Sequence, residues 1–253
     1  MVHETLWRVG MMTLPDHKQS RRAPAPTIAR LSTYLQCLRA LEKDGITTVS
    51  SADMARHTGI NAAQFRKDLS YFGEFGRPGV GYQVGDLKEI IQGRMGLQHP
   101  HRVLLVGAGS LGSALCSYPG FVEQGFNIVA VFDNNPLKVG QRIGAREVLS
   151  INDIVEKNRA LGARFGVIAA PKEAAQGIAR RLVDAGVRCI LNFAPVRLSV
   201  SAGDVVVRNV DLTQELEVLS YYLLQSASAS DDGGYGHGSA GEARASSSGD
   251  TPE

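Results

Sequence analysis

Six residues, Gly107–Gly112, have the types and spacing needed to bind a phosphate group. They read Gly-Ala-Gly-Ser-Leu-Gly and follow the apolar run Val103–Val106. In such a turn the first glycine permits a tight passage from strand to helix, the second lets the backbone approach a pyrophosphate, and the third lets the helix pack closely on the strand. The N–H groups at the start of the helix then face the phosphates. We expect ligand contacts from Gly107, Ala108, Gly109, Ser110, Leu111 and Gly112.

An acid follows the glycine turn at the end of the next predicted strand. Asp133 ends a second apolar run, Ile128–Phe132, slightly further from the glycines than the usual ~20 residues. A carboxylate there accepts hydrogen bonds from both hydroxyls of an adenine ribose and repels a 2′-phosphate. The pattern therefore favours NAD(H) over NADP(H). The other interpretation is a glycine turn in an ordinary α/β protein, with Asp133 as a turn residue.

Groups suited to proton transfer beside a nicotinamide ring are scarce. None of the six histidines lies between Arg102 and Gln225, and we expect Lys138, Lys157 and Lys172 on the surface. Tyr118 could face the ring. A dehydrogenase needs a positioned acid or base, so the nucleotide is expected to be sensed, and the protein is not expected to be an enzyme.

The elements that position these residues alternate between strand and helix. Strands are expected at 103–106, 128–132, 166–170, 188–192 and 205–210, with helices at 151–160 and 173–185. This order predicts a Rossmann-type parallel sheet over 97–211. A last helix, over 212–225, carries leucines at 212, 216, 219 and 223, which would dock either on its own sheet or on a second subunit. Residues 226–253, rich in Ser and Gly, are expected to be disordered.

A second group of residues could read DNA. Two short helices joined by a glycine follow a longer first helix, which is the helix-turn-helix arrangement. Ser50 with Asp53, and Asn61, are expected to cap the short helices. The outer face of the third helix carries Gln64, Arg66, Lys67, Ser70 and Tyr71, types that suit base edges and phosphates.

A glycine-rich stretch, Gly73–Tyr82, follows and is expected to form a tight hairpin whose tip is Arg77-Pro78-Gly79. Such a wing enters the minor groove beside the recognition helix. The expected DNA contacts also include Ser50, Ser51, Asn61, Arg77 and Gly79. The other interpretation is a three-helix interaction module with a solvated charged face.

Charge and composition agree with two modules. Over 17–82 there are ten Lys/Arg and five acids, a balance of +5, whereas the whole chain of 253 residues carries +2, leaving −3 elsewhere. The N-terminal arm, 1–25, is followed by a basic winged-helix domain over 26–96. Three distant cysteines fit neither a disulfide framework nor a metal site. No apolar stretch is long enough to span a bilayer, and we expect a cytoplasmic protein with no membrane partner.

Over about residues 26–225 the chain closely resembles the Rex family of redox-sensing transcriptional repressors. The resemblance is carried by Thr27–Leu31, Val49–Ser51, Phe65–Gly73, Pro78–Tyr82, Gly107–Gly112, Asn192–Pro195 and Asn209–Thr213. It implies a homodimer that binds a palindromic operator in double-stranded DNA and releases it when NADH binds. It also implies that the helix over 212–225 is exchanged between subunits.

The same resemblance implies roles for individual residues. Tyr118 would lie at the nicotinamide end of the site. Arg30 and Asp211 would form an interdomain pair in one state of the switch. The pocket walls would be Ala170, Pro171, Phe193, Ala194 and Pro195. An NAD-dependent oxidoreductase with an accessory helical domain and a nucleotide- or CoA-binding interaction module remain the alternatives.

Overall fold

The computed structural model describes residues 23–73, 75–76, 79–200 and 203–231, which form two compact units. The first comprises the described residues up to His101 together with Tyr118–Asn127. The second comprises Arg102–Ser117 and the described residues from Ile128 onward. Each unit has its own hydrophobic core.

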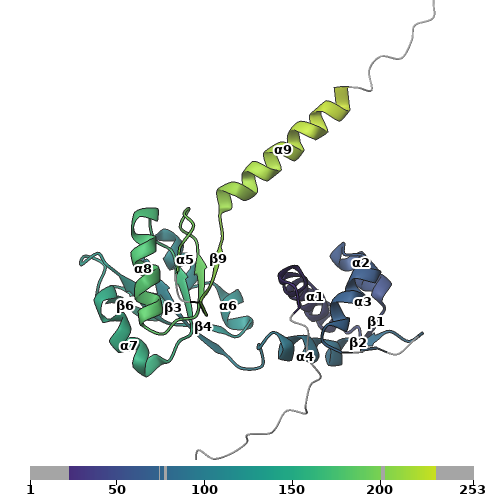
Figure 1. The fold of residues 1–253 in the computed structure, drawn as a ribbon, viewed down its shortest axis with the longest axis horizontal. Helices are drawn as coiled ribbons and strands as arrows, with labels where there is room; N and C mark the ends of the chain where they lie inside the picture. Colours follow the sequence, from purple (N-terminus) through teal and green to yellow (C-terminus); the bar gives the residue numbers. More distant parts are fainter. Residues whose placement is uncertain (1–22, 74, 77–78, 201–202, 232–253) are drawn as a thin grey trace, which may run out of the picture. The chain divides into compact units, whose positions relative to one another are not determined.

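The first unit is mainly helical (Figure 1). Its helices are α1 (Ala25–Lys43), α2 (Ser51–Thr58), α3 (Ala62–Ser70), α4 (Val84–Arg94) and the short α6 (Pro119–Glu123). Its strands are β1 (Thr48–Val49) and β2 (Tyr82–Gln83).

Side-chain caps set the starts of the two short helices. The Ser50 hydroxyl accepts from the Asp53 N–H, the Asp53 carboxylate accepts from the Ser50 N–H, and Gly59 ends α2 in the left-handed region at φ 70°. The Asn61 side chain accepts from the Gln64 N–H at 2.8 Å and starts α3. These contacts confirm the predicted caps and fix the turn between α2 and α3.

Aromatic packing holds α3 in the first unit. The Phe65 ring is fully buried and meets the rings of Tyr34 on α1 and Tyr82 on β2 edge to face, at 4.9 and 5.4 Å between centroids. This geometry suits aromatic quadrupoles. One face of α3 therefore packs against both α1 and the small β1–β2 sheet.

The hairpin expected over 73–82 lies partly outside the described residues, which omit 74, 77 and 78. Gly81 forms an isolated β-bridge, and strand β2 pairs antiparallel with β1, through Thr48↔Gln83 and Val49↔Tyr82. The partner strand thus precedes α2 and is distant in sequence, so the local glycine pattern could not reveal it.

The second unit contains a seven-stranded sheet in the order β5-β6-β4-β3-β7-β8-β9. The pairs β4–β6, β3–β7, β7–β8 and β8–β9 are parallel, and β5–β6 is antiparallel. The strands are β3 (His101–Val106), β4 (Phe126–Asp133), β5 (Arg142–Ile143), β6 (Arg146–Ser150), β7 (Phe165–Ile168), β8 (Cys189–Asn192) and β9 (Val206–Asn209). Strands β5 and β6 were not expected, because both are short and largely polar.

Helices cover this sheet. They are α5 (Ser110–Cys116), α7 (Ile154–Leu161, preceded by the 3-10 turn Ile151–Asp153) and α8 (Lys172–Asp184). The chain moves from β3 to β4 in one direction across the sheet but from β6 to β7 and from β7 to β8 in the other. Right-handed crossovers then place α5 opposite α7 and α8, and Figure 1 shows α7 and α8 side by side.

The last helix, α9, spans Leu212–Asp231 and so continues beyond the predicted end at 225. The described side chains over 212–225 are exposed, including Leu216 at 65% and Leu219 at 61%. In the single chain, Leu216 and Leu219 are therefore not packed on the sheet of the second unit.

Two features are absent from the described residues. None of their helices is long and apolar enough to cross a membrane. They also contain no group of three or more His, Cys, Asp or Glu placed to hold a metal ion.

Candidate functional site

A cavity of about 540 Å³ lies in the second unit, at the carboxyl ends of β3, β4 and β7. The sheet changes winding direction here, because β3 leads toward β4 and β7 leads toward β8. Open α/β sheets bind ligands at this kind of switch point. Its lining includes Gly107, Gly109, Asp133, Ala170 and Pro171, five of the residues that we expected to contact a nucleotide.

The three glycines of the turn have distinct geometric roles. Gly107 has φ 109°, and a Cβ there would lie 2.2 Å from the Ala169 oxygen. A Cβ on Gly112 would lie 1.8 Å from the Gly107 oxygen, so this glycine lets α5 pack against its own turn. A Cβ on Gly109 would meet nothing within 4 Å, which leaves the backbone open toward the cavity. The first and third glycines permit the fold, and the second leaves room for a ligand.

Asp133 joins the end of β4 to the glycine turn. It is 6% exposed, and its carboxylate accepts from the Ala108 N–H at 2.7 Å and the Asn135 N–H at 2.8 Å. Lys138 Nζ lies 3.4 Å from the same carboxylate. Burial acts to raise the pKa of Asp133, but the two N–H groups and the Lys138 charge outweigh it and hold the pKa below its usual value. The cavity therefore contains a carboxylate that is ionised at neutral pH.

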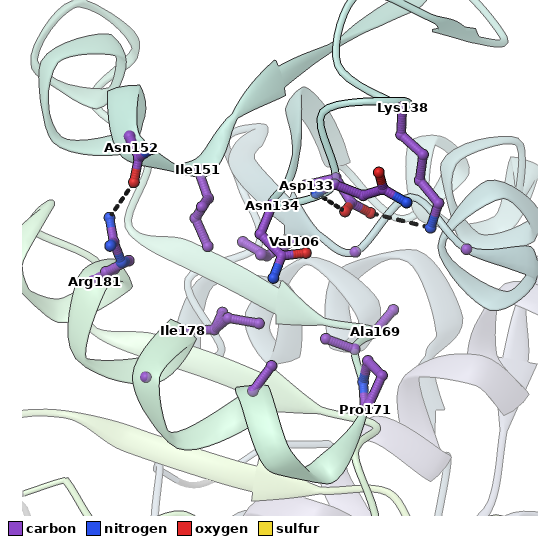
Figure 2. Close-up of a pocket in the computed structure, with 16 residues that line it drawn as sticks. Val106, Asp133, Asn134, Lys138, Ile151, Asn152, Ala169, Pro171, Ile178 and Arg181 are labelled. Carbon is purple, nitrogen blue, oxygen red and sulfur yellow. Dashed lines mark hydrogen bonds and ion pairs between the residues drawn. The ribbon is translucent and has the colours of Figure 1, made fainter.

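The cavity has polar ends and an apolar middle. Figure 2 shows Asp133 and Lys138 toward one end and Asn152 with Arg181 toward the other, where the Arg181 guanidinium donates to the Asn152 amide oxygen at 3.1 Å. Between them lie Ile151 and Ile178. An apolar slot beside a carboxylate suits a flat base attached to a ribose.

Sequence reasoning missed part of this lining. Lys138 was expected on the surface, yet it faces Asp133 with about a third of its side chain exposed. Arg181 and Asn134 also line the cavity and were not expected there. Lys138 follows Asp133 by five positions in the loop after β4, and that spacing is the signal that could have identified it.

Other expected ligand residues lie near the turn or beyond the cavity. Ala108 donates to Asp133, and Ser110 and Leu111 begin α5, with Leu111 39% exposed. The cavity lining does not include Phe193, Ala194 or Pro195. Tyr118 belongs to the first unit, where it precedes α6, is 57% exposed and meets Phe121 edge to face.

The turn at Phe193–Pro195 is shaped by Asn192, which is fully buried at the end of β8. Its amide donates to the Ala194 and Val196 oxygens and, at 2.9 Å, to the Asn209 side chain on β9. Its oxygen accepts from the Ala194 N–H at 3.0 Å. This network fixes the backbone after β8, so Ala194 and its neighbours are held in one conformation.

On the first unit, α3 presents a polar face. Arg66 and Lys67 are exposed, and Gln64 and Tyr71 are half-buried. The Arg66 guanidinium donates to the Ser51 hydroxyl at 2.7 Å, and the Ser70 hydroxyl donates to the Lys67 oxygen at 2.8 Å. Gly79 lies in the loop before β2 at φ 78°, and Arg77 lies outside the described residues.

Arg30 and Asp211, the expected interdomain pair, both have local partners. Arg30 on α1 forms a bidentate ion pair with Asp68 on α3, at 2.6 and 2.7 Å. The Asp211 carboxylate accepts from the Thr213 and Gln214 N–H groups at the start of α9. Asp68 is a further functional candidate that sequence reasoning missed.

Comparison with known proteins places these features in one class. A family model described as "Putative DNA-binding protein N-terminus" matches residues 22–70, and one described as "CoA binding domain" matches 98–196. The fold and the site together define a two-part protein, with an N-terminal DNA-binding domain and a C-terminal Rossmann-type nucleotide-binding domain.

Particular relatives identify the family. The redox-sensing transcriptional repressor Rex of Carboxydothermus hydrogenoformans is 52% identical over 200 residues, which cover 79% of this chain and 96% of that protein. A crystal structure of RSP with β-NAD⁺ and operator DNA matches with a TM-score of 0.76 at 34% identity, covering 83% of this chain and 97% of the other. One of RSP with β-NADH matches with a TM-score of 0.75 at 32% identity, covering 83% and 99%. The chain belongs to the Rex family of redox-sensing transcriptional repressors.

Proposed function

We propose that this protein is a transcriptional repressor that senses the NADH/NAD⁺ ratio. It binds a palindromic operator as a homodimer and releases it when NADH binds. The observation that carries this proposal is the cavity at the switch point, bounded by the glycine turn and Asp133, in a chain whose other unit is a helix-turn-helix. The related RSP was crystallised with NAD⁺ and operator DNA and with NADH, which supports the same ligands here.

The adenosine half of the nucleotide would occupy the described cavity. The pyrophosphate would lie on Gly107–Gly112, where Gly109 leaves open space. The Asp133 carboxylate would accept from the ribose hydroxyls, and its negative charge would repel a 2′-phosphate. NAD(H) is therefore favoured over NADP(H).

The nicotinamide half would meet an apolar surface. We assign this surface to Tyr118, Ala170, Pro171, Phe193, Ala194 and Pro195. NAD⁺ carries a positive ring and NADH a neutral one, and burying an unpaired charge costs far more than burying a neutral ring. Such a pocket would bind NADH more tightly. A ligand must bind one state more tightly than the other by about 5.5 kcal/mol to shift a two-state equilibrium from 1:99 to 99:1.

The DNA-binding domain, assigned to 26–96, would place α3 in the major groove. The N-terminal residues of a recognition helix contact base edges, and Gln64 is the third residue of α3. The assigned contacts are Ser50, Ser51, Asn61, Gln64, Arg66, Lys67, Ser70, Tyr71, Arg77 and Gly79.

The homodimer would form through α9, with the segment 212–225 exchanged between subunits. The apolar side chains Leu212, Leu216, Val218, Leu219 and Tyr222 are 45–65% exposed in the single chain. They lie around more than one side of the helix, so a second copy would have to enclose it. Leu216→Asp should give monomers in sedimentation equilibrium, whereas Glu217→Gln on the same helix should remain dimeric.

Ligand binding would reach the DNA through Arg30 and Asp211. We infer that they pair across the domains in one state, so that Arg30 would weaken its pair with Asp68 or share its guanidinium between the two acids. The two helix-turn-helix units of the closed dimer would then be wrongly spaced for successive major grooves.

We assign no catalytic residue. The titratable side chains that line the described cavity are Asp133, Lys138 and Arg181, and Asp133 and Lys138 are paired with each other. The curated relative is named a repressor, which supports a sensing role for the nucleotide in the cytoplasm. Sustained NADH oxidation with a small-molecule acceptor would instead favour an oxidoreductase.

A binding experiment tests the proposed function. A labelled palindromic duplex selected from a random pool should bind two chains per duplex, with an affinity that falls as salt rises. A scrambled duplex of the same length should bind at least a hundredfold more weakly. Equal binding to both duplexes would contradict a sequence-specific repressor.

A further inference from the structure

Asp68 is a fully buried carboxylate on α3, the helix proposed to enter the major groove. Four side chains donate hydrogen bonds to it from two helices. They are Thr27 at 3.0 Å, Arg30 at 2.6 and 2.7 Å, Tyr34 at 2.9 Å and Gln64 at 2.8 Å. Three of these come from α1, and the fourth, Gln64, lies one helical turn before Asp68 on α3.

The charge state of Asp68 follows from these partners. Burial acts to raise its pKa, but the hydrogen bonds from Arg30, Tyr34, Gln64 and Thr27 outweigh burial and lower the pKa. Asp68 is therefore ionised at neutral pH. An ionised carboxylate accepts hydrogen bonds and cannot donate one.

This requirement orients the Gln64 amide. Only its NH₂ group can face an ionised carboxylate, so Nε2 points at Asp68 and Oε1 points away from it. Every buried side-chain oxygen and nitrogen of the described residues has a partner, yet Oε1 makes no hydrogen bond there. Oε1 must therefore reach solvent on the half-buried Gln64 side chain.

We propose that Asp68 is a positioning residue for DNA readout, which makes Gln64 present its carbonyl oxygen to a base that carries an exocyclic amino group. In the major groove these bases are adenine, through N6, and cytosine, through N4. Guanine O6 and thymine O4 are acceptors, and an oriented Oε1 would repel them. This inference rests on the proposed binding of α3 to DNA.

The position of Gln64 agrees with this role. It lies in the first turn of α3, from which side chains reach base edges. Of its two amide hydrogens one is held by Asp68, so the other remains available for adenine N7. A freely rotating glutamine would present either amide group and discriminate less between bases.

Base analogues test the proposal on the intact protein. In an operator duplex selected from a random palindromic pool, each adenine is replaced in turn by purine and each cytosine by pyrimidin-2-one, which removes only the amino group. At one position per half-site we expect about tenfold weaker binding to the wild type, the size of one good base contact. Gln64→Ala should show less than a twofold change at that position.

Asp68→Asn supplies the second arm, because an asparagine no longer dictates which amide group faces it. In the Asp68→Asn variant, removing the amino group at that same position should weaken binding threefold or less. Tyr34→Phe is the matched control: it removes one donor to Asp68 but leaves the Gln64 contact in place, and it should keep the tenfold dependence. Equal weakening of every duplex by Asp68→Asn would overturn the proposal, since that result describes a purely structural acid.

Nuclear magnetic resonance keeps the test decisive if Asp68→Asn does not fold. The side-chain amide signals of Gln64 are assigned as those that disappear in Gln64→Ala. In the wild type, one of the two amide protons should be shifted downfield and exchange slowly with solvent. Two equivalent, fast-exchanging protons would overturn the proposal. If the wild type selects no duplex at all, the proposed function itself fails, whereas selection without any Gln64-dependent amino contact rejects only the role of Asp68.

Discussion

Arg30 on α1 and Asp68 on α3 form a bidentate ion pair in which the aspartate is fully buried and the arginine is about a quarter exposed. The pair bonds the first helix of the DNA-binding unit to the helix expected to enter the major groove. Two parallel N–H···O bonds give this contact a defined geometry as well as energy. Any change at Arg30 is therefore transmitted to the recognition helix.

Removing Arg30 should destabilise the first unit measurably. Arg30→Ala leaves the buried Asp68 charge with its remaining donors Thr27, Tyr34 and Gln64, and we expect a loss of about 3 kcal/mol, at the lower end of the range for breaking a buried pair. Urea unfolding followed by circular dichroism measures it. Lys88→Ala, which breaks the more exposed pair with Glu42, should cost about 1 kcal/mol or less. Equal losses of unfolding free energy in the two variants would show that the buried pair stabilises the protein no more than the exposed pair does.

Acid should destabilise the protein through the same carboxylate. The pKa of Asp68 is lowered in the folded state, because hydrogen bonds from Arg30 and the other donors outweigh burial. Its stabilisation is thus complete above the ordinary aspartate pKa of about 3.9 and is lost as the pH falls below that value toward the lower folded pKa. The free energy of unfolding, measured between pH 6 and 2.5, should fall less steeply in Asp68→Asn than in the wild type. Parallel curves would contradict this account.

The two glycines at the start of α5 should respond differently to alanine. Gly112→Ala places a Cβ against the Gly107 oxygen, so we expect a loss of about 3 kcal/mol in stability. Gly109→Ala meets open space at a negative φ and should change stability by about 0.5 kcal/mol or less. Its Cβ would instead occupy space beside the pyrophosphate and weaken NADH binding at least tenfold. Thermal unfolding and NADH fluorescence titration separate the two effects, and full NADH affinity in Gly109→Ala would place the pyrophosphate elsewhere.

Asp133 should control the choice between NADH and NADPH. Asp133→Asn removes the charge that would face a 2′-phosphate but keeps Lys138 close by. We expect the ratio of NADPH to NADH affinity to rise about tenfold or more, since two like charges in contact at a protein surface cost more than the 1.4 kcal/mol that this represents. Isothermal titration measures both ligands. The added substitution Lys138→Met should cancel the gain, and Asp184→Asn, an equal charge change outside the cavity lining, should have no effect.

Local sequence patterns predicted much of the structure. The caps at Ser50 and Asn61 and the glycine turn depend on residues within a few positions of one another, and the structure confirms those elements. The polar outer face predicted for α3 leaves Phe65 and Leu69 for the core, where both are buried.

What sequence reasoning missed depends on distant partners. Asp68 lies between Lys67 and Leu69 and could pass for a solvated acid, but its donors Thr27 and Arg30 come from about forty positions earlier in the chain. Strand β2 pairs with a strand that precedes α2, and Lys138 acquires its place only when its loop folds back on Asp133. The contacts of Asp68 and the pairing of β2 have no local pattern, and only Lys138, five positions after Asp133, has a local signal.

We propose that NADH, and not NAD⁺, releases this protein from its operator. The most direct measurement is fluorescence anisotropy of a preformed complex with the selected duplex, at fixed salt, titrated with NADH and separately with NAD⁺. We predict loss of the bound signal at NADH concentrations at least tenfold below any effect of NAD⁺, and a weakened response in Arg30→Ala. A complex that both nucleotides leave intact, or that both dissolve equally, would contradict redox sensing.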